Sequence, residues 1–350
     1  MSEDRYQPPP TIPGALRLHL NENTGGCSPA VLEAVRQVTA HEIAVYPDYS
    51  ALIQECVRYL GVDASRIVLT NGLDEGLLSA VIASFRPDPS SPGIPEGIVV
   101  LPAFEMYAIQ IRAAGGHLVA IPSRDDFEFP TEELLQAVTP ETRIICLTSP
   151  NNPTGLLVPR AALRQIARQV PSRVTVILDE AYYEFCGETF IAELREYPNV
   201  VVGRTFAKAH GLAGLRAGCL VGEPRTLEPI RNVVPPFNVS VLTAAGWLAA
   251  LKDGSHLAWY QNQVSSSKQL VYEHCDRLGL KYWKSHGNFV LIRVGPKAPA
   301  VVSALATQGI LIKDRSHEQG CEGCVRMTAG VVEHTTRALA AMEEFLCAAR

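Results

Sequence analysis

The chain has 350 residues and a formal net charge of −5, with 47% hydrophobic and 19% charged residues. This composition is typical of a globular protein with a large buried core, and it excludes a disordered chain. Charges of one sign do not gather in runs, which argues against a nucleic-acid-binding protein or a polybasic membrane anchor. The sequence has neither an apolar stretch of about 18–20 residues nor a secretory signal pattern, so we expect a cytoplasmic protein.

The nine cysteines are odd in number and scattered, which argues against a framework of disulfide bonds. Cys321 and Cys324 form a C-x-x-C pair, a spacing found in zinc sites, but the sequence has no second pair at ligand spacing. Cys324 also begins an apparent strand. We therefore expect two ordinary thiols and no metal site.

Short apolar, β-branched segments alternate with longer amphipathic segments over most of the chain. The expected strands are 66–70, 97–103, 117–122, 143–150, 174–180, 200–205 and 217–222. The expected helices are 28–39, 74–85, 105–114, 131–138 and 159–170. This alternation predicts an α/β fold in which helices cover both faces of a mixed, mostly parallel sheet.

The pattern changes after about residue 223 and predicts a second, smaller α+β domain. Its expected elements are helices 224–253, 256–278, 297–308 and 331–348 and strands 281–285, 288–294, 310–314 and 324–329. Pro235 and Pro236 break helicity and mark the expected domain junction. We expect an N-terminal segment (1–40) associated with the small domain, a large domain (41–235) and a small domain (236–350).

Residues that can hold a ligand follow the carboxyl ends of the expected strands, where ligands bind in open parallel sheets. After strand 66–70, a glycine turn and a helix start place Asp74 among free backbone N–H groups that can hold a phosphate. An ordinary capped helix explains the same residues. After strand 143–150, the string SPNNPTG places Asn152 where its amide can orient an oxygen of a ligand ring, although Asn, Pro and Gly also form simple turns.

Asp179 and Lys208 are charged residues that follow apolar segments. A buried carboxylate at Asp179 needs a partner such as a protonated ring nitrogen, and a helix N-cap is the alternative interpretation. The Asp-Glu pair of a nucleotide-hydrolysing enzyme is a third interpretation, but the sequence lacks the phosphate-binding loop that such an enzyme requires. Burial of Lys208 lowers the pKa of its amine toward the neutral form that a Schiff base requires. Thr205 and Arg216, on either side of Lys208, can meet at one phosphate.

Together these sites resemble the fold-type I aminotransferases that use pyridoxal 5′-phosphate (PLP), and within them the histidinol-phosphate aminotransferase family. The matching strings, in order, are LNEN (20–23), YPD (46–48), DEG (74–76), PAFEMY (102–107), SPNNPTG (149–155), DEAYYEF (179–185), AKAHGLAGLR (207–216), NF (288–289) and CVRMTAG (324–330). The resemblance covers residues 18–345. It implies a cytoplasmic PLP enzyme that acts as a homodimer.

The resemblance implies a role for each matching residue around the ring of PLP. Lys208 would form the Schiff base and move the proton between the substrate α-carbon and the cofactor. Asp179 would keep the pyridine nitrogen protonated, so that the ring withdraws electrons. Asn152 and Tyr182 would bind the phenolic oxygen of the ring, and Phe104 would stack on its face.

The resemblance also implies how the cofactor phosphate and the partner subunit contribute. Asp74, Thr205 and Arg216 would hold the phosphate, together with backbone N–H groups of the segment that includes Glu75. Tyr46 would reach the phosphate in the neighbouring subunit, so that each active site would be shared across the dimer.

For the substrate, the resemblance implies that Arg326 receives an anionic group, with Asn23, Lys313 and Tyr6 as further contacts. The sequence departs from the family pattern at several of these positions. Ala207 replaces a serine that binds phosphate, Phe104 stands at a position where tyrosine is common, and Lys313 stands at a position where arginine is common. Lysine keeps the charge but not the fork-shaped pair of donors, and Tyr6 matches the family only loosely.

The expected reaction is transamination of L-histidinol phosphate with 2-oxoglutarate, giving imidazole acetol phosphate and L-glutamate. Three alternatives remain open at this point. Two keep the cofactor: an aromatic amino acid aminotransferase, and a decarboxylase of a phosphorylated amino acid such as threonine phosphate. The third is a ligand-binding protein of the same fold without catalysis.

Overall fold

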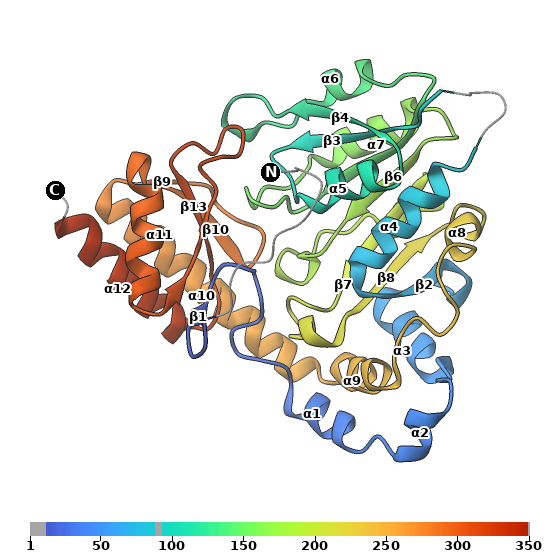
Figure 1. Cartoon of the computed structure of the whole chain (residues 1–350), viewed down its shortest axis with the longest axis horizontal. Helices are drawn as coiled ribbons and strands as arrows, with labels where there is room; N and C mark the ends of the chain where they lie inside the picture. The colour runs from blue at the N-terminus through green and yellow to red at the C-terminus, as the bar shows by residue number, and fades with distance from the viewer. Residues whose placement is uncertain (1–11, 88–92, 349–350) are drawn as a thin grey trace.

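The structure, a computed structural model, describes residues 12–87 and 93–348. It consists of a large lobe around a seven-stranded sheet and a smaller lobe formed mostly by residues 254–348 (Figure 1). In the part of the chain that is described, no helix combines the length and the apolar character needed to cross a membrane.

The sheet of the large lobe has the strand order β2-β8-β7-β6-β5-β3-β4. Its strands are β2 (Ile67–Asn71), β3 (Glu96–Leu101), β4 (His117–Pro122), β5 (Thr142–Thr148), β6 (Thr175–Asp179), β7 (Val200–Thr205) and β8 (Ala217–Gly222). β8 runs antiparallel to both of its neighbours, and the other neighbouring pairs are parallel. The predicted mixed, mostly parallel sheet is confirmed.

Helices cover both faces of this sheet. The helices of the large lobe are α1 (Pro29–Arg36), α2 (Ala40–Ala44), α3 (Ser50–Leu60), α4 (Gly72–Ser84), α5 (Met106–Ala113), α6 (Thr131–Gln136), α7 (Arg160–Gln169), α8 (Pro224–Arg231) and α9 (Val241–Lys252). Successive residues of β5 alternate between two cores: Ile145 packs with α6, α7 and α9, whereas Ile144 packs with α4, α5 and α8. Burial on both faces explains why the strands are continuously apolar.

The small lobe has an antiparallel sheet in the order β12-β13-β10-β9, covered by helices. Its strands are β9 (Lys281–Tyr282), β10 (Phe289–Arg293), β12 (Lys313–Asp314) and β13 (Cys324–Thr328), and its helices are α10 (Gly254–Leu278), α11 (Ala298–Thr307) and α12 (Val332–Ala348). A separate parallel pair joins β1 (Leu16–Arg17) to β11 (Ile310–Leu311). Short 3₁₀ turns lie at Ala64–Arg66, Asp125–Phe127, Tyr183–Phe185, Ile191–Glu193, Ala213–Leu215 and Gly295–Lys297.

The structure corrects some of the expected elements. The helix expected over 224–253 is wrong, because the segment that contains Pro235 and Pro236 separates α8 from α9. α3 is not among the expected helices, and its N-cap residue, Tyr49, provides no side-chain cap that would mark its start. The strand expected over 310–314 is divided at Ile312 into β11 and β12.

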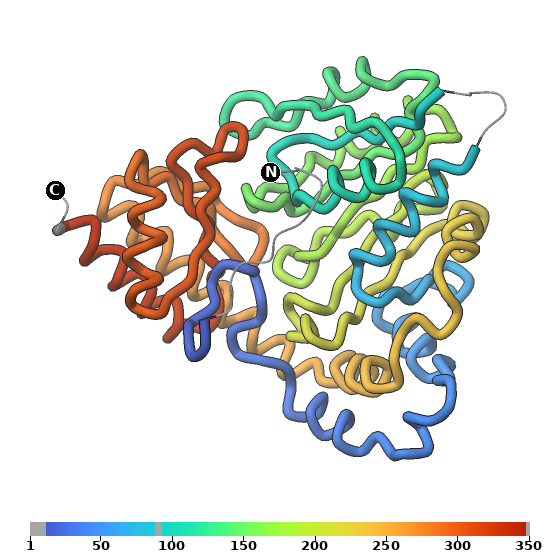
Figure 2. Tube along the Cα trace, in the orientation of Figure 1, coloured from blue at the N-terminus to red at the C-terminus, as the bar shows by residue number. Residues whose placement is uncertain are grey.

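Two segments connect the lobes, as the trace in Figure 2 shows. In the N-terminal segment, Leu18 belongs to the core of the small lobe, whereas α1 packs against α9 in the large lobe. In the second connection, Trp247 of α9 lies in the core of the large lobe, and α10 continues from there into the small lobe. The domain boundaries expected from the sequence stay predictions, and the packing of α9 in the large lobe favours a junction after Lys252.

Gly218 on β8 determines how closely α4 can approach the sheet. A Cβ atom at residue 218 would lie 2.6 Å from the backbone nitrogen of Leu73 and 2.7 Å from the carbonyl carbon of Gly72. These atoms belong to the first turn of α4. A side chain at residue 218 would therefore push the start of α4 away from the sheet.

We predict that Gly218→Ala lowers the free energy of unfolding by about 1–3 kcal/mol, the range typical of an overpacked core. Urea unfolding followed by circular dichroism measures this change. Gly254→Ala is the matched control, because a Cβ atom at residue 254 meets nothing within 4 Å. Equal stability of the two variants would show that α4 is not held by close contact with β8.

Candidate active site

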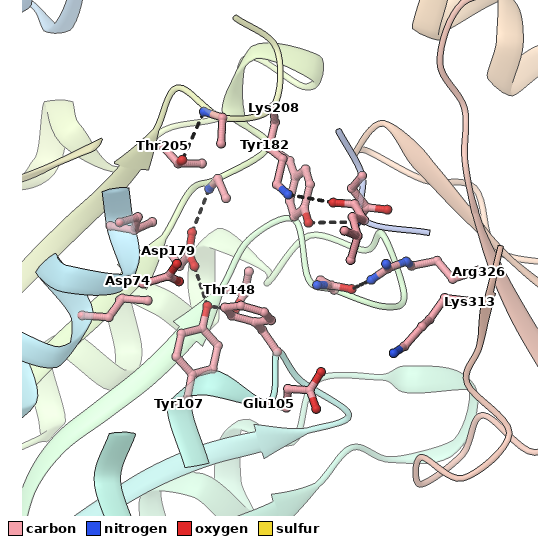
Figure 3. A pocket seen from close by; sticks show the side chains of 18 of the residues that line it. Asp74, Glu105, Tyr107, Thr148, Asp179, Tyr182, Thr205, Lys208, Lys313 and Arg326 are labelled. Carbon is pink, nitrogen blue, oxygen red and sulfur yellow. Dashed lines mark hydrogen bonds between the residues drawn. The ribbon is translucent and has the colours of Figure 1, made fainter. Parts of the chain in front are cut away.

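A cavity of about 840 Å³, open to solvent, brings residues of both lobes together. Most of the site residues predicted from the sequence line it, and Figure 3 shows many of them pointing toward one another. These residues are Asp74, Phe104, Asn152, Asp179, Tyr182, Thr205, Lys208, Arg216, Lys313 and Arg326.

Lys208 follows β7 and brings a partly buried amine into the cavity. Its Nζ atom donates a hydrogen bond to the backbone oxygen of Leu20, at 2.9 Å. Burial, together with the positive charge of Arg326, lowers the pKa of Lys208 to about 8. The amine is therefore easier to deprotonate than that of an exposed lysine, as a nucleophile requires.

Asp179 is the last residue of β6, and its carboxylate is almost fully buried. Its oxygens accept hydrogen bonds from the hydroxyl of Tyr107, at 2.5 Å, and from the backbone N–H of Ala181, at 2.9 Å. Burial raises the pKa of Asp179 to about 6, although both hydrogen bonds and the charge of Lys208 act in the opposite direction. Burying a charged carboxylate costs free energy, and a cationic partner beside Asp179 would offset much of that cost.

The start of α4 forms one end of the cavity, where Arg216 donates to Asp74 at 2.7 Å. Gly72 makes this pairing possible: its φ is +72°, and a Cβ atom there would lie 2.5 Å from the guanidinium of Arg216. The hydroxyl of Thr205 lies at the same cavity and accepts from the backbone N–H of Ala207, at 3.2 Å. A helix N-terminus, a guanidinium and a hydroxyl are suitable donors for a phosphate.

Asn152 and Tyr182 lie between this end of the cavity and the small lobe. The Oδ1 atom of Asn152 accepts hydrogen bonds from Arg326 and, at 3.5 Å, from Arg315. The hydroxyl of Tyr182 accepts from the side chain of Asn21, at 3.0 Å. The two arginines thus orient the amide of Asn152 through its Oδ1 atom.

The small lobe supplies the cationic end of the cavity. Lys313 of β12 and Arg326 of β13 are register partners on neighbouring strands, and Arg315 lies just beyond them. Arg326 also donates to the backbone oxygen of His19, at 2.5 Å. Burial, with Arg315 and Arg326 nearby, lowers the pKa of Lys313. This concentration of positive charge suits an anionic substrate group.

Asn23 and Glu75 were expected at the site but do not line this cavity. The Nδ2 atom of Asn23 donates to the backbone oxygen of Ala209, at 2.9 Å, and so holds the segment that follows Lys208. The carboxylate of Glu75 accepts from the backbone N–H of Asn71, at 2.7 Å. The side chains of both residues support the surrounding backbone.

Tyr46 lies on the surface, outside the cavity of its own chain. Its side chain is 78% exposed and stacks on Phe237 with 4.4 Å between the ring centroids. Tyr6, the remaining expected substrate contact, lies outside the described residues.

The cavity also contains residues that the sequence analysis did not identify: His19, Asn21, Glu105, Tyr107 and Arg315. Tyr107 had a usable signal, because it lies one helical turn after Phe104, on the helix that follows β3. Asn21 belongs to the LNEN string with Asn23, and His19 directly precedes that string. Their contribution depends on how the N-terminal segment crosses between the lobes, which no local pattern indicates.

The donor set fits PLP. Asp179 can pair with a protonated pyridine nitrogen, Lys208 can bind the aldehyde, and the start of α4 with Arg216 can receive the phosphate. The guanidinium of Arg216 can lie against Gly72 only because glycine has no Cβ atom. Among the described residues, no group of three or more His, Cys, Asp or Glu side chains could hold a metal ion.

Comparison with known proteins gives a consistent family assignment. The pattern of the family described as aminotransferase class I and II matches residues 13–342. A histidinol-phosphate aminotransferase from Methanosarcina mazei is 36% identical over 338 residues, which cover 94% of this chain and 87% of the relative. One from a Geobacillus species is 33% identical over 337 residues, which cover 95% of this chain and 90% of the relative.

Among solved structures, histidinol-phosphate aminotransferase from Sinorhizobium meliloti, in complex with pyridoxal-5′-phosphate, is similar with a TM-score of 0.86 and 29% identity. The similarity covers 96% of this chain and 92% of that chain. The family match spans nearly the whole sequence, and the cavity contains the amine, the buried carboxylate and the anion-binding ends described above. This chain belongs to the class I and II aminotransferases.

Proposed function

We propose that this chain is a PLP-dependent aminotransferase that converts L-histidinol phosphate and 2-oxoglutarate to imidazole acetol phosphate and L-glutamate. One observation carries the proposal: a single cavity contains Lys208 and Asp179, with anion-binding groups at both of its ends. One end suits the phosphate of the cofactor, and the other suits an anionic group of the substrate. The histidinol-phosphate aminotransferases that are 33% and 36% identical to this chain support this substrate.

PLP, when bound, supplies an electron-withdrawing ring that stabilises negative charge on the substrate α-carbon. Asp179 would keep the proton on the ring nitrogen, because a buried carboxylate gains most from a cation beside it. Tyr107 and Ala181 hold that carboxylate in place. Phe104, which meets Tyr107 edge to face at 5.7 Å between centroids, would cover one face of the ring.

At the cofactor phosphate, backbone N–H groups at the start of α4, Thr205 and Arg216 would act as donors. Asp74 holds Arg216 in position through their ion pair. Asn152 would donate its amide NH₂ to the ring oxygen, and Tyr182 would donate its hydroxyl there. Because Ala207 lacks a hydroxyl, this chain has one phosphate donor fewer than its family pattern.

Lys208 would hold the cofactor between reactions and would move a proton to and from the substrate α-carbon during them. A positioned amine of lowered pKa suits both tasks, because it can give up and regain its proton near neutral pH. The backbone oxygen of Leu20 accepts from its Nζ atom and can keep the amine oriented.

The cationic end of the cavity would serve both half-reactions. Arg326 and Lys313 would bind the phosphate of L-histidinol phosphate in one half-reaction and a carboxylate of glutamate in the other. Lys313 carries charge without the planar fork of arginine, so Arg326 supplies the bidentate geometry. Arg326 is held in position by its hydrogen bonds to Asn152 Oδ1 and to the backbone oxygen of His19.

We propose a homodimer in which Tyr46 reaches the cofactor phosphate of the partner subunit. Apolar side chains on one part of the large lobe remain exposed and support this contact. They are Leu32, Ile43, Val45, Tyr46, Phe237 and Leu242. Exposed apolar side chains gathered in this way are typical of protein interfaces.

We place the enzyme in the cytoplasm, in keeping with its nine free cysteines.

The substrate is tested with a panel of amino donors, each with and without 2-oxoglutarate. We expect L-histidinol phosphate to react with a higher kcat/KM than phenylalanine or tyrosine, and only when the oxo acid is present. Faster turnover of the aromatic amino acids would replace the proposed substrate. Release of carbon dioxide from threonine phosphate without the oxo acid would replace the proposed reaction.

The lowered pKa of Lys208 predicts how apoenzyme captures PLP. The neutral amine is the reactive form, so the rate of bond formation with PLP should rise with pH through about 8 and then level off. For an ordinary lysine this rate would continue to rise toward pH 10.5. Stopped-flow absorbance measures the rate, and borohydride makes the bond permanent. Lys208→Ala should form no borohydride-stable bond, and exposed Lys284→Ala should match wild type. A bond retained in Lys208→Ala would remove Lys208 from the mechanism.

The shared site predicts complementation between two inactive variants. When Tyr46→Ala and Lys208→Ala subunits are exchanged at equal amounts, half of the dimers are mixed and each contains one intact site. Activity should therefore recover to about a quarter of wild type. Asp179→Asn mixed with Lys208→Ala is the control and should recover nothing, because both residues belong to the same chain's site. A fully active monomer would rule out sharing.

A further inference from the structure

His19 is held against the cationic end of the cavity by backbone contacts with the small lobe. The residue before it, Leu18, donates its N–H to Leu311 at 2.8 Å and accepts from Thr328 at 2.9 Å. The backbone oxygen of His19 accepts from Arg326. These contacts fix the backbone of His19 beside β11 and β13, and His19 lines the same cavity as Lys313 and Arg326.

The side chain of His19 is buried, and one of its two ring nitrogens lacks a hydrogen-bond partner among the described residues. The residue is 4% exposed, and its Nδ1 atom has no hydrogen-bond partner within the described ranges. Burial, with the positive charges of Arg17, Lys313 and Arg326, lowers its pKa to about 4, and the charge of Glu22 acts in the opposite direction. Near neutral pH the ring is therefore uncharged, with one nitrogen able to donate and one able to accept.

We propose that His19 is a specificity-determining residue that makes the cationic end of the cavity prefer a phosphate monoester to a carboxylate. This inference rests on the proposed function, in which the same end receives each group in turn. Lys313 and Arg326 attract both anions. His19 would distinguish them by donating a hydrogen bond to the phosphate.

The charge of the ligand gives the physical reason. A phosphate monoester carries close to two negative charges near pH 7, whereas a carboxylate carries one. The stronger negative charge favours a protonated imidazole, in opposition to Arg17, Lys313 and Arg326. A charged imidazole donates from both nitrogens and forms the stronger hydrogen bond. Phosphate binding should therefore be coupled to proton uptake by His19, and carboxylate binding should be coupled to it much less.

The kinetic test compares the two half-reactions of the holoenzyme, followed by cofactor absorbance. In His19→Leu, kcat/KM for L-histidinol phosphate should fall about ten- to a hundredfold, as expected for loss of a hydrogen bond to a charged group. For glutamate it should change less than about threefold. His19→Gln keeps a neutral donor and should give an intermediate loss, and His117→Gln, at an exposed residue, should match wild type. Equal losses in both half-reactions would indicate a purely structural role and overturn the inference.

The second test measures protons directly and does not depend on turnover. Inorganic phosphate is titrated into holoenzyme at pH 7 by calorimetry, in buffers of different ionisation enthalpy. Wild type should take up more protons than His19→Gln, and the two should not differ when acetate replaces phosphate. The same number of protons in both proteins with phosphate would overturn the inference.

The outcomes separate this inference from the function on which it rests. A wild-type enzyme that does not convert L-histidinol phosphate would contradict the proposed function, and calorimetry would still decide the preference of His19 for phosphate. If wild type converts L-histidinol phosphate, and His19→Leu keeps the same ratio of kcat/KM between L-histidinol phosphate and glutamate, only the inference about His19 is contradicted.

Discussion

The structure depends on placing a partly buried amine and a buried carboxylate together in one cavity. Burial disfavours charge, so it lowers the pKa of Lys208 to about 8 and raises that of Asp179 to about 6. Both residues are thereby shifted toward the range in which protons move at physiological pH. A cofactor with a cationic ring nitrogen and an aldehyde would relieve both costs, which explains why the two groups can remain buried in a stable protein.

The parallel sheet brings these two groups to the same edge. Asp179 at the end of β6 is the register partner of Gly203 in β7, and Lys208 follows a few residues later. The next strand, β8, returns antiparallel, and Gly218 on it leaves room for the start of α4. The amine, the carboxylate and the phosphate-binding turn thus meet through strand order and close packing.

The N-terminal segment connects the cofactor to the substrate end. Its backbone accepts from Lys208 at Leu20 and from Arg326 at His19, and its Asn21 donates to Tyr182. Three consecutive positions of one segment therefore contact both ends of the cavity, while the preceding strand pairs with β11 of the small lobe.

The sequence by itself determined the mixed sheet, its strands and the residues that end them, because these depend on local periodicity and on the rule that parallel strands end at one edge. Lys208, Asp179, Asn152 and Arg216 could be named for this reason. Tertiary structure decided which other residues join them: His19 lines the cavity, whereas Glu75 does not, although it neighbours Asp74. It also decided that α9 packs in the large lobe. Such choices follow from how separate segments pack in space, and that packing leaves no periodic signal in the chain.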